Sequence, residues 1–340
     1  MKNKLKTALG LFAMGSLAMV SCTDVESVEI VQPTVEETYP ESYAAYVQAL
    51  NEYKASDHKI VYAWFDNSEK VPQSAGQHIT SIPDSVDVIS MMYPESLAEF
   101  ELNDMEEVRG KGTKVVYTVS VPDIEQAWVD QQFANGGDQS TMTSEFNAYL
   151  QTQLDALFAC SASFDGVIVE FVGQDPTFMT ETTLAAYEAK QNIVLNAAST
   201  WKNANADKIL TWQGKPQNLT DKSILTSCDC IILDIDDVED TNRLMLTVQQ
   251  ALTEGVPTDN ILIAVSTTPE SSSDTSYGYW GSTRALGEVA NWVSAGYPAT
   301  DGFTRAGIAI YNVQNDYYAT GGLYTYVKEA INTLNPAPTK

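Results

Sequence analysis

The chain has 340 residues, of which 44% are hydrophobic, and its formal net charge at pH 7 is −26. This length suits one large barrel or two medium-sized domains. The acidic charge excludes nucleic acid and anionic lipid as favourable partners because both would be repelled, whereas a neutral ligand remains compatible with it.

The N-terminus has the pattern of a secretory signal. Three lysines precede an apolar run over residues 8–20, which leads into Ser21 and Cys22, and this run is too short to cross a membrane as a helix. The residues before Cys22 resemble a bacterial lipobox, with Met19 as a loose match to its first position. The resemblance implies a signal peptide over residues 1–21 and lipidation at Cys22. The alternative is a plain signal peptide that happens to end at a cysteine.

The residues after Cys22 indicate where such a protein would be displayed. Asp24, Glu26 and Glu29 resemble the signal that sends lipoproteins of gut Bacteroidetes to the outer cell surface. The expected location is therefore the outer membrane, with a lipid anchor and the protein at the cell surface. Residues 22–40 are acidic and lack a helical or strand period, which is typical of a tether. The folded domain is then expected over residues 41–340.

The cysteines beyond the signal predict no metal centre. Cys160, Cys228 and Cys230 are odd in number and lack the spacing of a zinc site or of a disulfide framework. The early strands are also not followed by a glycine-rich nucleotide fingerprint. We therefore expect neither a metal nor a cofactor.

Short apolar runs rich in β-branched residues alternate with segments of helical period. The strand candidates are residues 59–65, 86–92, 113–120, 165–172, 208–212, 229–233, 260–265 and 307–311. The helix candidates, several of which are followed by Gly or Pro, are residues 41–54, 145–161, 180–201, 241–253, 282–295 and 322–334. This alternation predicts an α/β fold, a (β/α)8 TIM-type barrel. Residues 66–84 lack a clear helix, so the first repeat is expected to be incomplete, and an open doubly wound sheet is the second choice.

The fourth strand candidate resembles a known motif. It begins at Asp165 and Gly166 and continues Val-Ile-Val-Glu-Phe-Val, which resembles the DGxDxDxE strand of glycoside hydrolase family 18, the chitinases and endo-β-N-acetylglucosaminidases. Residues 112–116 resemble the third strand of that family, and residues 307–313 resemble the last strand of its endo-β-N-acetylglucosaminidase branch. The resemblance covers roughly residues 59–334.

The chain departs from the family where the chemistry should be. Ile168 replaces the first downstream Asp, Glu170 replaces the second, and Val172 stands where the resemblance implies the proton-donating Glu. Glu170 keeps the inward direction but lies about 6.6 Å deeper along the strand, so we interpret it as a carboxylate of the barrel interior. Near the sixth strand, residues 233–237 read Leu-Asp-Ile-Asp-Asp and lack the tyrosine that the family often places there.

Aromatic and amide side chains remain at the expected C-terminal face of the barrel. Sugars stack on aromatic rings and need paired donors and acceptors, so this mixture suits a carbohydrate. Each aromatic residue alone could equally be core packing, and the aspartates could belong to a solvated helix N-terminus. The candidate glycan-binding residues are Trp64, Tyr93, Trp212, Gln213, Asp234, Asp236, Tyr279, Trp280, Tyr311 and Asn312.

Two functions follow from the resemblance. The first is a non-catalytic surface lipoprotein that captures glycans containing N-acetylglucosamine or mannose, such as N-glycans, beside a Sus-type transporter. The second is an active endo-β-N-acetylglucosaminidase with displaced acids, in which Glu170 would be catalytic. The loss of two acids and one tyrosine from one mechanism favours the first. A purely structural barrel is the third alternative.

Overall fold

The structure is a computed structural model that describes residues 34–134, 136, 139–235, 238–269, 277–319 and 321–337, with the side chains of residues 139–144 left out. The chain divides into two compact units, Met1–Tyr43 and Ala44–Lys340. The second unit contains the barrel.

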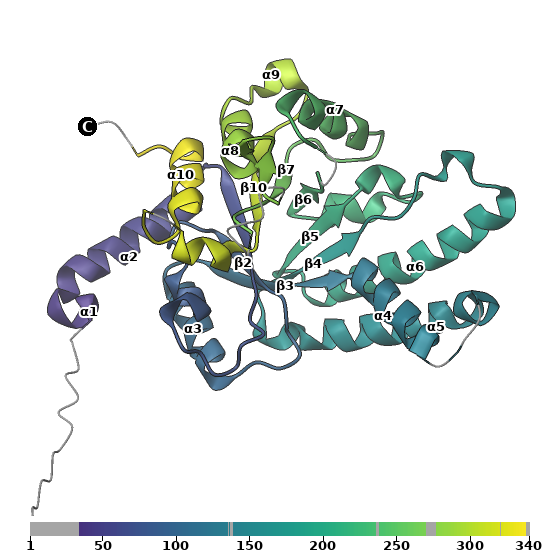
Figure 1. Cartoon of the computed structure of the whole chain (residues 1–340), viewed down its shortest axis with the longest axis horizontal. Coiled ribbons are helices and arrows are strands. Elements are labelled where there is room, and N and C mark those ends of the chain that lie inside the picture. Colours follow the sequence, from purple (N-terminus) through teal and green to yellow (C-terminus); the bar gives the residue numbers. More distant parts are fainter. Residues whose placement is uncertain are drawn as a thin grey trace, which may run out of the picture. The chain divides into compact units, whose positions relative to one another are not determined.

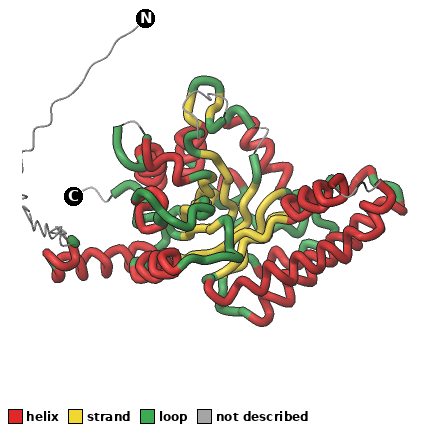
Figure 2. Tube along the Cα trace, turned by 60° about the horizontal axis from the view of Figure 1, so that its bottom comes forward, coloured by secondary structure: helices red, strands yellow, loops and turns green. Residues whose placement is uncertain are grey.

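Eight parallel strands close into a barrel at the centre of the second unit (Figures 1 and 2). Each strand is hydrogen-bonded to its neighbours in the order β1-β10-β7-β6-β5-β4-β3-β2, with β2 closing onto β1. The predicted TIM-type barrel is therefore confirmed. The strands are β1 Ile60–Phe65, β2 Val88–Met91, β3 Lys114–Ser120, β4 Gly166–Phe171, β5 Ile209–Gly214, β6 Cys230–Leu233, β7 Ile261–Ser266 and β10 Arg305–Tyr311.

The apolar strands are buried on both faces, as a barrel covered by helices requires. Inward side chains such as Tyr62, Val116 and Ile168 form one core cluster inside the barrel. Outward side chains such as Val169 and Trp212 form a larger cluster with the surrounding helices. Side chains alternate between these two clusters along each strand.

Helices cover the outside of the barrel (Figure 2). Two of them, α3 Glu99–Gly110 and α4 Val121–Ala134, were not among the helix candidates. Among the described residues, no helix is both long enough and apolar enough to cross a membrane. The helices of the second unit are α3 Glu99–Gly110, α4 Val121–Ala134, α5 Gln139–Ala159, α6 Glu181–Ala204, α7 Thr241–Ala251, α8 Ala285–Ser294, α9 Pro298–Asp301 and α10 Thr325–Leu334.

Two repeats contain only 3-10 turns in place of a helix. Ala75–Gln77 and Ile79–Ser81 connect β1 to β2, so the first repeat is incomplete, as predicted. Pro216–Asn218 and Ser223–Ser227 connect β5 to β6, which the sequence reading did not predict. A β8–β9 hairpin, Tyr279–Trp280 with Thr283–Arg284, precedes α8.

The predicted tether is only partly described. Residues 22–33, including Cys22, lie outside the described residues. Its last part was wrongly read as irregular, because Val35–Thr38 form the short helix α1 and α2 begins at Pro40 and runs to Ala55. A capping box explains α1: the Glu37 backbone N–H donates to Thr34 Oγ1 at 3.2 Å, and the Thr34 N–H donates to the Glu37 carboxylate at 2.8 Å.

The pair Asp165-Gly166 at the start of β4 has a packing role. The Asp165 carboxylate accepts hydrogen bonds from the Val115 backbone N–H at 2.7 Å and from Arg109 Nε at 2.9 Å. A Cβ atom on Gly166 would lie 2.4 Å from the carbonyl oxygen of Ile209. These two residues therefore fix how β3, β4 and β5 meet at the N-terminal end of β4.

We predict that Gly166→Ala lowers the free energy of unfolding by about 1–3 kcal/mol, because β4 and β5 must separate to admit the methyl group. Urea denaturation would measure the change. Gly287→Ala is the matched control, since its Cβ would meet no atom within 4 Å and alanine favours a helix. Equal stability of the two variants would contradict this account of Gly166.

Candidate functional site

The C-terminal mouth of the barrel is lined by inward polar and aromatic side chains. The Trp64 indole N–H donates to Thr118 Oγ1 at 2.8 Å, and the Trp64 ring stacks on Tyr311 with ring centroids 4.3 Å apart. These contacts leave Trp64 only 3% exposed. The face of Trp64 that could stack on a sugar is therefore already covered by Tyr311.

A hydrogen-bonded tie crosses this mouth. Gln213 Nε2 donates to the Tyr311 hydroxyl, which donates in turn to Asp234 Oδ1 at 3.3 Å. Tyr311 is on β10 and Gln213 is on β5, and β7 and β6 separate these strands in the barrel order. The side chain of Tyr311 thus reaches across the mouth to the opposite strands and fills the space between them.

Glu170 lies beside this tie and faces the barrel interior. Its neighbours Val169 and Phe171 belong to the outer cluster, whereas Ile168 belongs to the inner cluster, so alternation turns Glu170 inward. Its register partners are Ser120 of β3 and Gln213 of β5. The inward direction predicted for Glu170 is therefore what the structure has.

Val172 directly follows the last residue of β4. It carries no proton to donate, and its carbonyl oxygen accepts a hydrogen bond from Asn218 Nδ2 at 2.9 Å. The position that the family resemblance assigns to the proton donor is thus apolar, and its backbone is bound to the loop after β5.

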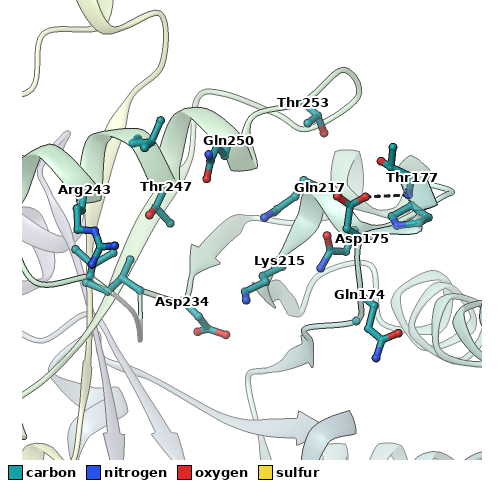
Figure 3. A pocket seen from close by; sticks show the side chains of 16 residues that line it. Gln174, Asp175, Thr177, Lys215, Gln217, Asp234, Arg243, Thr247, Gln250 and Thr253 are labelled. Carbon is teal, nitrogen blue, oxygen red and sulfur yellow. Dashed lines mark hydrogen bonds between the residues drawn. The ribbon is translucent and has the colours of Figure 1, made fainter. Parts of the chain in front are cut away.

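A groove of about 980 Å³ opens beside the mouth, over the loops that follow β4, β5 and β6. Figure 3 shows Arg243, Thr247 and Gln250 projecting from α7 on one side, with Gln217, Asp175 and Thr177 on the other and Lys215 and Asp234 between them. Its volume lies in the range of small-molecule sites. Most of its lining residues carry amide, hydroxyl or charged side chains, so the groove offers hydrogen-bonding partners to a hydroxyl-rich ligand.

Asp175 has its carboxylate engaged within the groove wall. Its Oδ1 accepts a hydrogen bond from the Thr177 backbone N–H at 2.9 Å. Hydrogen bonds from the Thr177 side chain and backbone hold the pKa of Asp175 below its usual value. Asp175 is therefore an ionised turn-capping residue and no candidate for a general acid.

A smaller pocket of about 180 Å³ adjoins the groove. Tyr277, Tyr279, Trp280 and Tyr311 line it, and Ile235 and Val238 line both this pocket and the groove. Asn312 borders it, because its side-chain amide donates to the Tyr277 hydroxyl. The aromatic residues predicted after the seventh strand are thus gathered next to the mouth.

The structure brings most predicted site residues together. Trp64, Gln213, Asp234 and Tyr311 meet at the mouth, and Tyr279, Trp280 and Asn312 surround the smaller pocket. Tyr93 is 44% exposed in the loop after β2, where its backbone N–H is bound by Asn67, and it lines neither cavity. Asp236 lies outside the described residues.

Trp212 was wrongly predicted to bind glycan. Its side chain belongs to the outer cluster, is 0% exposed and packs against Phe171 with ring centroids 6.2 Å apart. Consecutive strand residues face opposite sides. Because Gln213 points inward to the Tyr311 hydroxyl, Trp212 must point outward.

Most polar residues of the groove were not predicted from the sequence. Lys215 follows β5, Gln217 lies in the next turn and Arg243 lies in α7, so no local motif connects them.

Several solved structures share this fold. A mutant endo-β-N-acetylglucosaminidase from Cordyceps militaris, in complex with fucosyl-N-acetylglucosamine-Asn, has a TM-score of 0.60 at 18% identity over 85% of this chain and 95% of that chain. A selenomethionine form of BT1044 has a TM-score of 0.59 at 17% identity, covering 90% and 96% of the respective chains. A family 18 chitinase from Pseudoalteromonas aurantia has a TM-score of 0.54 at 11% identity, covering 81% and 100%.

The sequence itself gives the family. Among curated proteins, none matches this chain. The family model described as glycoside hydrolase family 18, BT1044-like, matches residues 23–333. Since that match spans most of the sequence and the barrel agrees with it, the chain belongs to the BT1044-like group of glycoside hydrolase family 18.

Proposed function

We propose that this protein is a glycan-binding barrel without hydrolytic activity, displayed on the cell surface by a lipid anchor. The absence of hydrolytic activity is inferred from the end of β4. There, Val172 replaces the acid of the family motif, and Glu170 lies deeper in the barrel. Substrate-assisted hydrolysis needs a proton donor within hydrogen-bond reach of the glycosidic oxygen. A valine at that position provides none.

The reach of Glu170 supports the same proposal. Position 170 lies two residues, or about 6.6 Å, deeper along the strand than position 172. The family motif has Asp at position 170, and Glu170 extends only one methylene group further than that Asp would. This added length is far too short to reach the position of the proton donor. Glu170 also lies in register with Gln213, which is 1% exposed and tied to Tyr311. A sugar would have to displace this tie before its glycosidic oxygen could approach the carboxylate.

The groove supports binding without chemistry. Its amide and hydroxyl groups offer both donors and acceptors for sugar hydroxyls, and the neighbouring pocket adds Tyr277, Tyr279 and Trp280. The Cordyceps militaris structure holds fucosyl-N-acetylglucosamine-Asn. Glycans that contain N-acetylglucosamine, N-glycans among them, are therefore the first ligand class to test. A Sus-type transporter is the proposed partner for their uptake.

One observation favours the alternative of an active endo-β-N-acetylglucosaminidase: Glu170 does face the barrel interior beside the Gln213–Tyr311–Asp234 tie. If a ligand opened this tie, Glu170 would be the available acid. The two functions therefore differ in one measurable property, which is turnover.

We predict no hydrolysis of chitooligosaccharides or N-glycans by the purified domain, because correctly placed general acid catalysis contributes about 10²- to 10⁴-fold to the rate and its donor is missing. Mass spectrometry of the reducing ends after long incubation would detect turnover. Glu170→Gln is the diagnostic variant, with Glu181→Gln at the exposed start of α6 as its control. Turnover that is lost only in Glu170→Gln would establish the enzyme alternative.

A second prediction concerns where glycans bind. Thr247→Trp should fill the groove from α7 and weaken glycan binding at least about tenfold, equivalent to about 1.4 kcal/mol. Gln249→Trp on the same helix is the matched control, because Gln249 is exposed and does not line the groove. Calorimetry with a glycan identified on an array would compare them. Equal affinities for both variants would move the binding site away from the groove.

The anchor has its own test. Cys22→Ala should release the protein from membranes while leaving the thermal unfolding of the barrel unchanged, since the lipid supplies the membrane affinity. Membrane fractionation measures the release, and protease treatment of intact cells that express the unaltered chain measures surface exposure. Retention of Cys22→Ala in the membrane fraction, or protection of the unaltered chain from protease, would refute the proposed anchoring.

A further inference from the structure

The groove contains two cationic side chains without partners. Among the lysines and arginines that the structure describes, almost all bind an acid, a backbone carbonyl oxygen or an aromatic ring. The described exceptions, with no hydrogen bond, ion pair or ring contact of their side chains, are Lys114, Lys215 and Arg243. Two of these three line the same groove. In a chain of formal charge −26, cations would be expected to pair with the abundant acids, so two unpaired cations in one groove suggest that they bind a ligand.

Arg243 lies at an electrostatically unfavourable place for a cation without a partner. It lies in the first turn of α7, next to the cap residue Asp240, which accepts hydrogen bonds from the Asn242 and Arg243 backbone N–H groups at 2.8 and 2.9 Å. The N-terminal end of a helix is positive, so a cation there is unfavourable. The Asp240 carboxylate binds the helix backbone and does not pair with the guanidinium of Arg243, which faces the groove.

The acids that line the groove within the described part of the chain, in contrast, are engaged. Asp175 accepts the Thr177 N–H at 2.9 Å, and Asp234 accepts the Tyr311 hydroxyl at 3.3 Å. Lys215 lies between the two walls in Figure 3, and Arg243 projects from α7. Among the described lining residues, the groups left available to a ligand are thus two cations, together with neutral amides and hydroxyls such as Gln217 and Thr247.

We propose that the groove binds an acidic oligosaccharide, a glycan in which one sugar carries a carboxylate, with Lys215 and Arg243 as the anion-binding pair. This inference rests on the proposed glycan-binding function and specifies its ligand class. Lysine and arginine both form charge-assisted hydrogen bonds with carboxylates, and the guanidinium can bind bidentately. The acidic charge of the whole chain repels anions at long range, so only a ligand that also fits the neutral lining would bind.

The test compares glycans that differ only in the acid. Calorimetry on the whole domain would use a sialylated N-glycan against its desialylated form, and an oligogalacturonide against its methyl ester. The unaltered protein should bind at least one acidic member about tenfold more tightly than its neutral counterpart. Lys215→Gln and Arg243→Gln should each weaken acidic-glycan binding by about three- to tenfold and leave neutral-glycan binding nearly unchanged.

Lys114→Gln provides the matched control. It removes the same charge from the third unpartnered cation, which is exposed at the first residue of β3, the N-terminal end of that strand, and it should bind both members of each pair like the unaltered protein. Equal affinity for acidic and neutral glycans, or equal losses in all three variants, would overturn the acidic-ligand inference while leaving neutral-glycan binding intact. Binding of no glycan at all would overturn both the inference and the proposed function.

Discussion

The alternation of side chains along the strands of a closed barrel is the constraint on which the site depends. Each inward position lies at a fixed depth, and the next residue must face the helices. Glu170 is therefore held at the level of Gln213, with Val169 and Phe171 packed outward on either side of it. It cannot rise to the position of Val172 unless the whole strand shifts by two residues, which would separate Gly166 from Ile209.

The same constraint explains which parts of the family motif persist. Asp165 and Gly166 fix how β4 meets its neighbours, so this barrel needs them whether or not it performs chemistry. Val172, at the other end, lies just beyond the last residue of β4 and is only partly buried. Near that end, Tyr311 binds Gln213 and stacks on Trp64. These side chains fill the centre of the mouth, and the groove beside α7 is larger than the pocket lined by Tyr277 and Trp280.

The sequence predicted the barrel well because each strand carries its own signal. Buried β-branched runs, bounded by turn residues and followed by helical periods, place the strands within a few residues of those observed. The site was predicted in part. Trp212 and Gln213 are adjacent, so strand alternation could already have excluded one of them. Lys215 and Arg243 could not be paired from sequence, because only the folded barrel brings the loop after β5 opposite α7.

The end of β4 carries Val172 in place of an acid, and the groove beside it has the size of a small-molecule site and mostly polar lining residues. A crystal structure of the domain, grown with an intact glycan that it binds, tests both parts together. We predict electron density for the uncleaved glycan in the groove between α7 and the loops after β4 and β5, with the Tyr311–Gln213 hydrogen bond preserved. A cleaved product at Glu170, or a glycan bound outside the groove, would contradict the account.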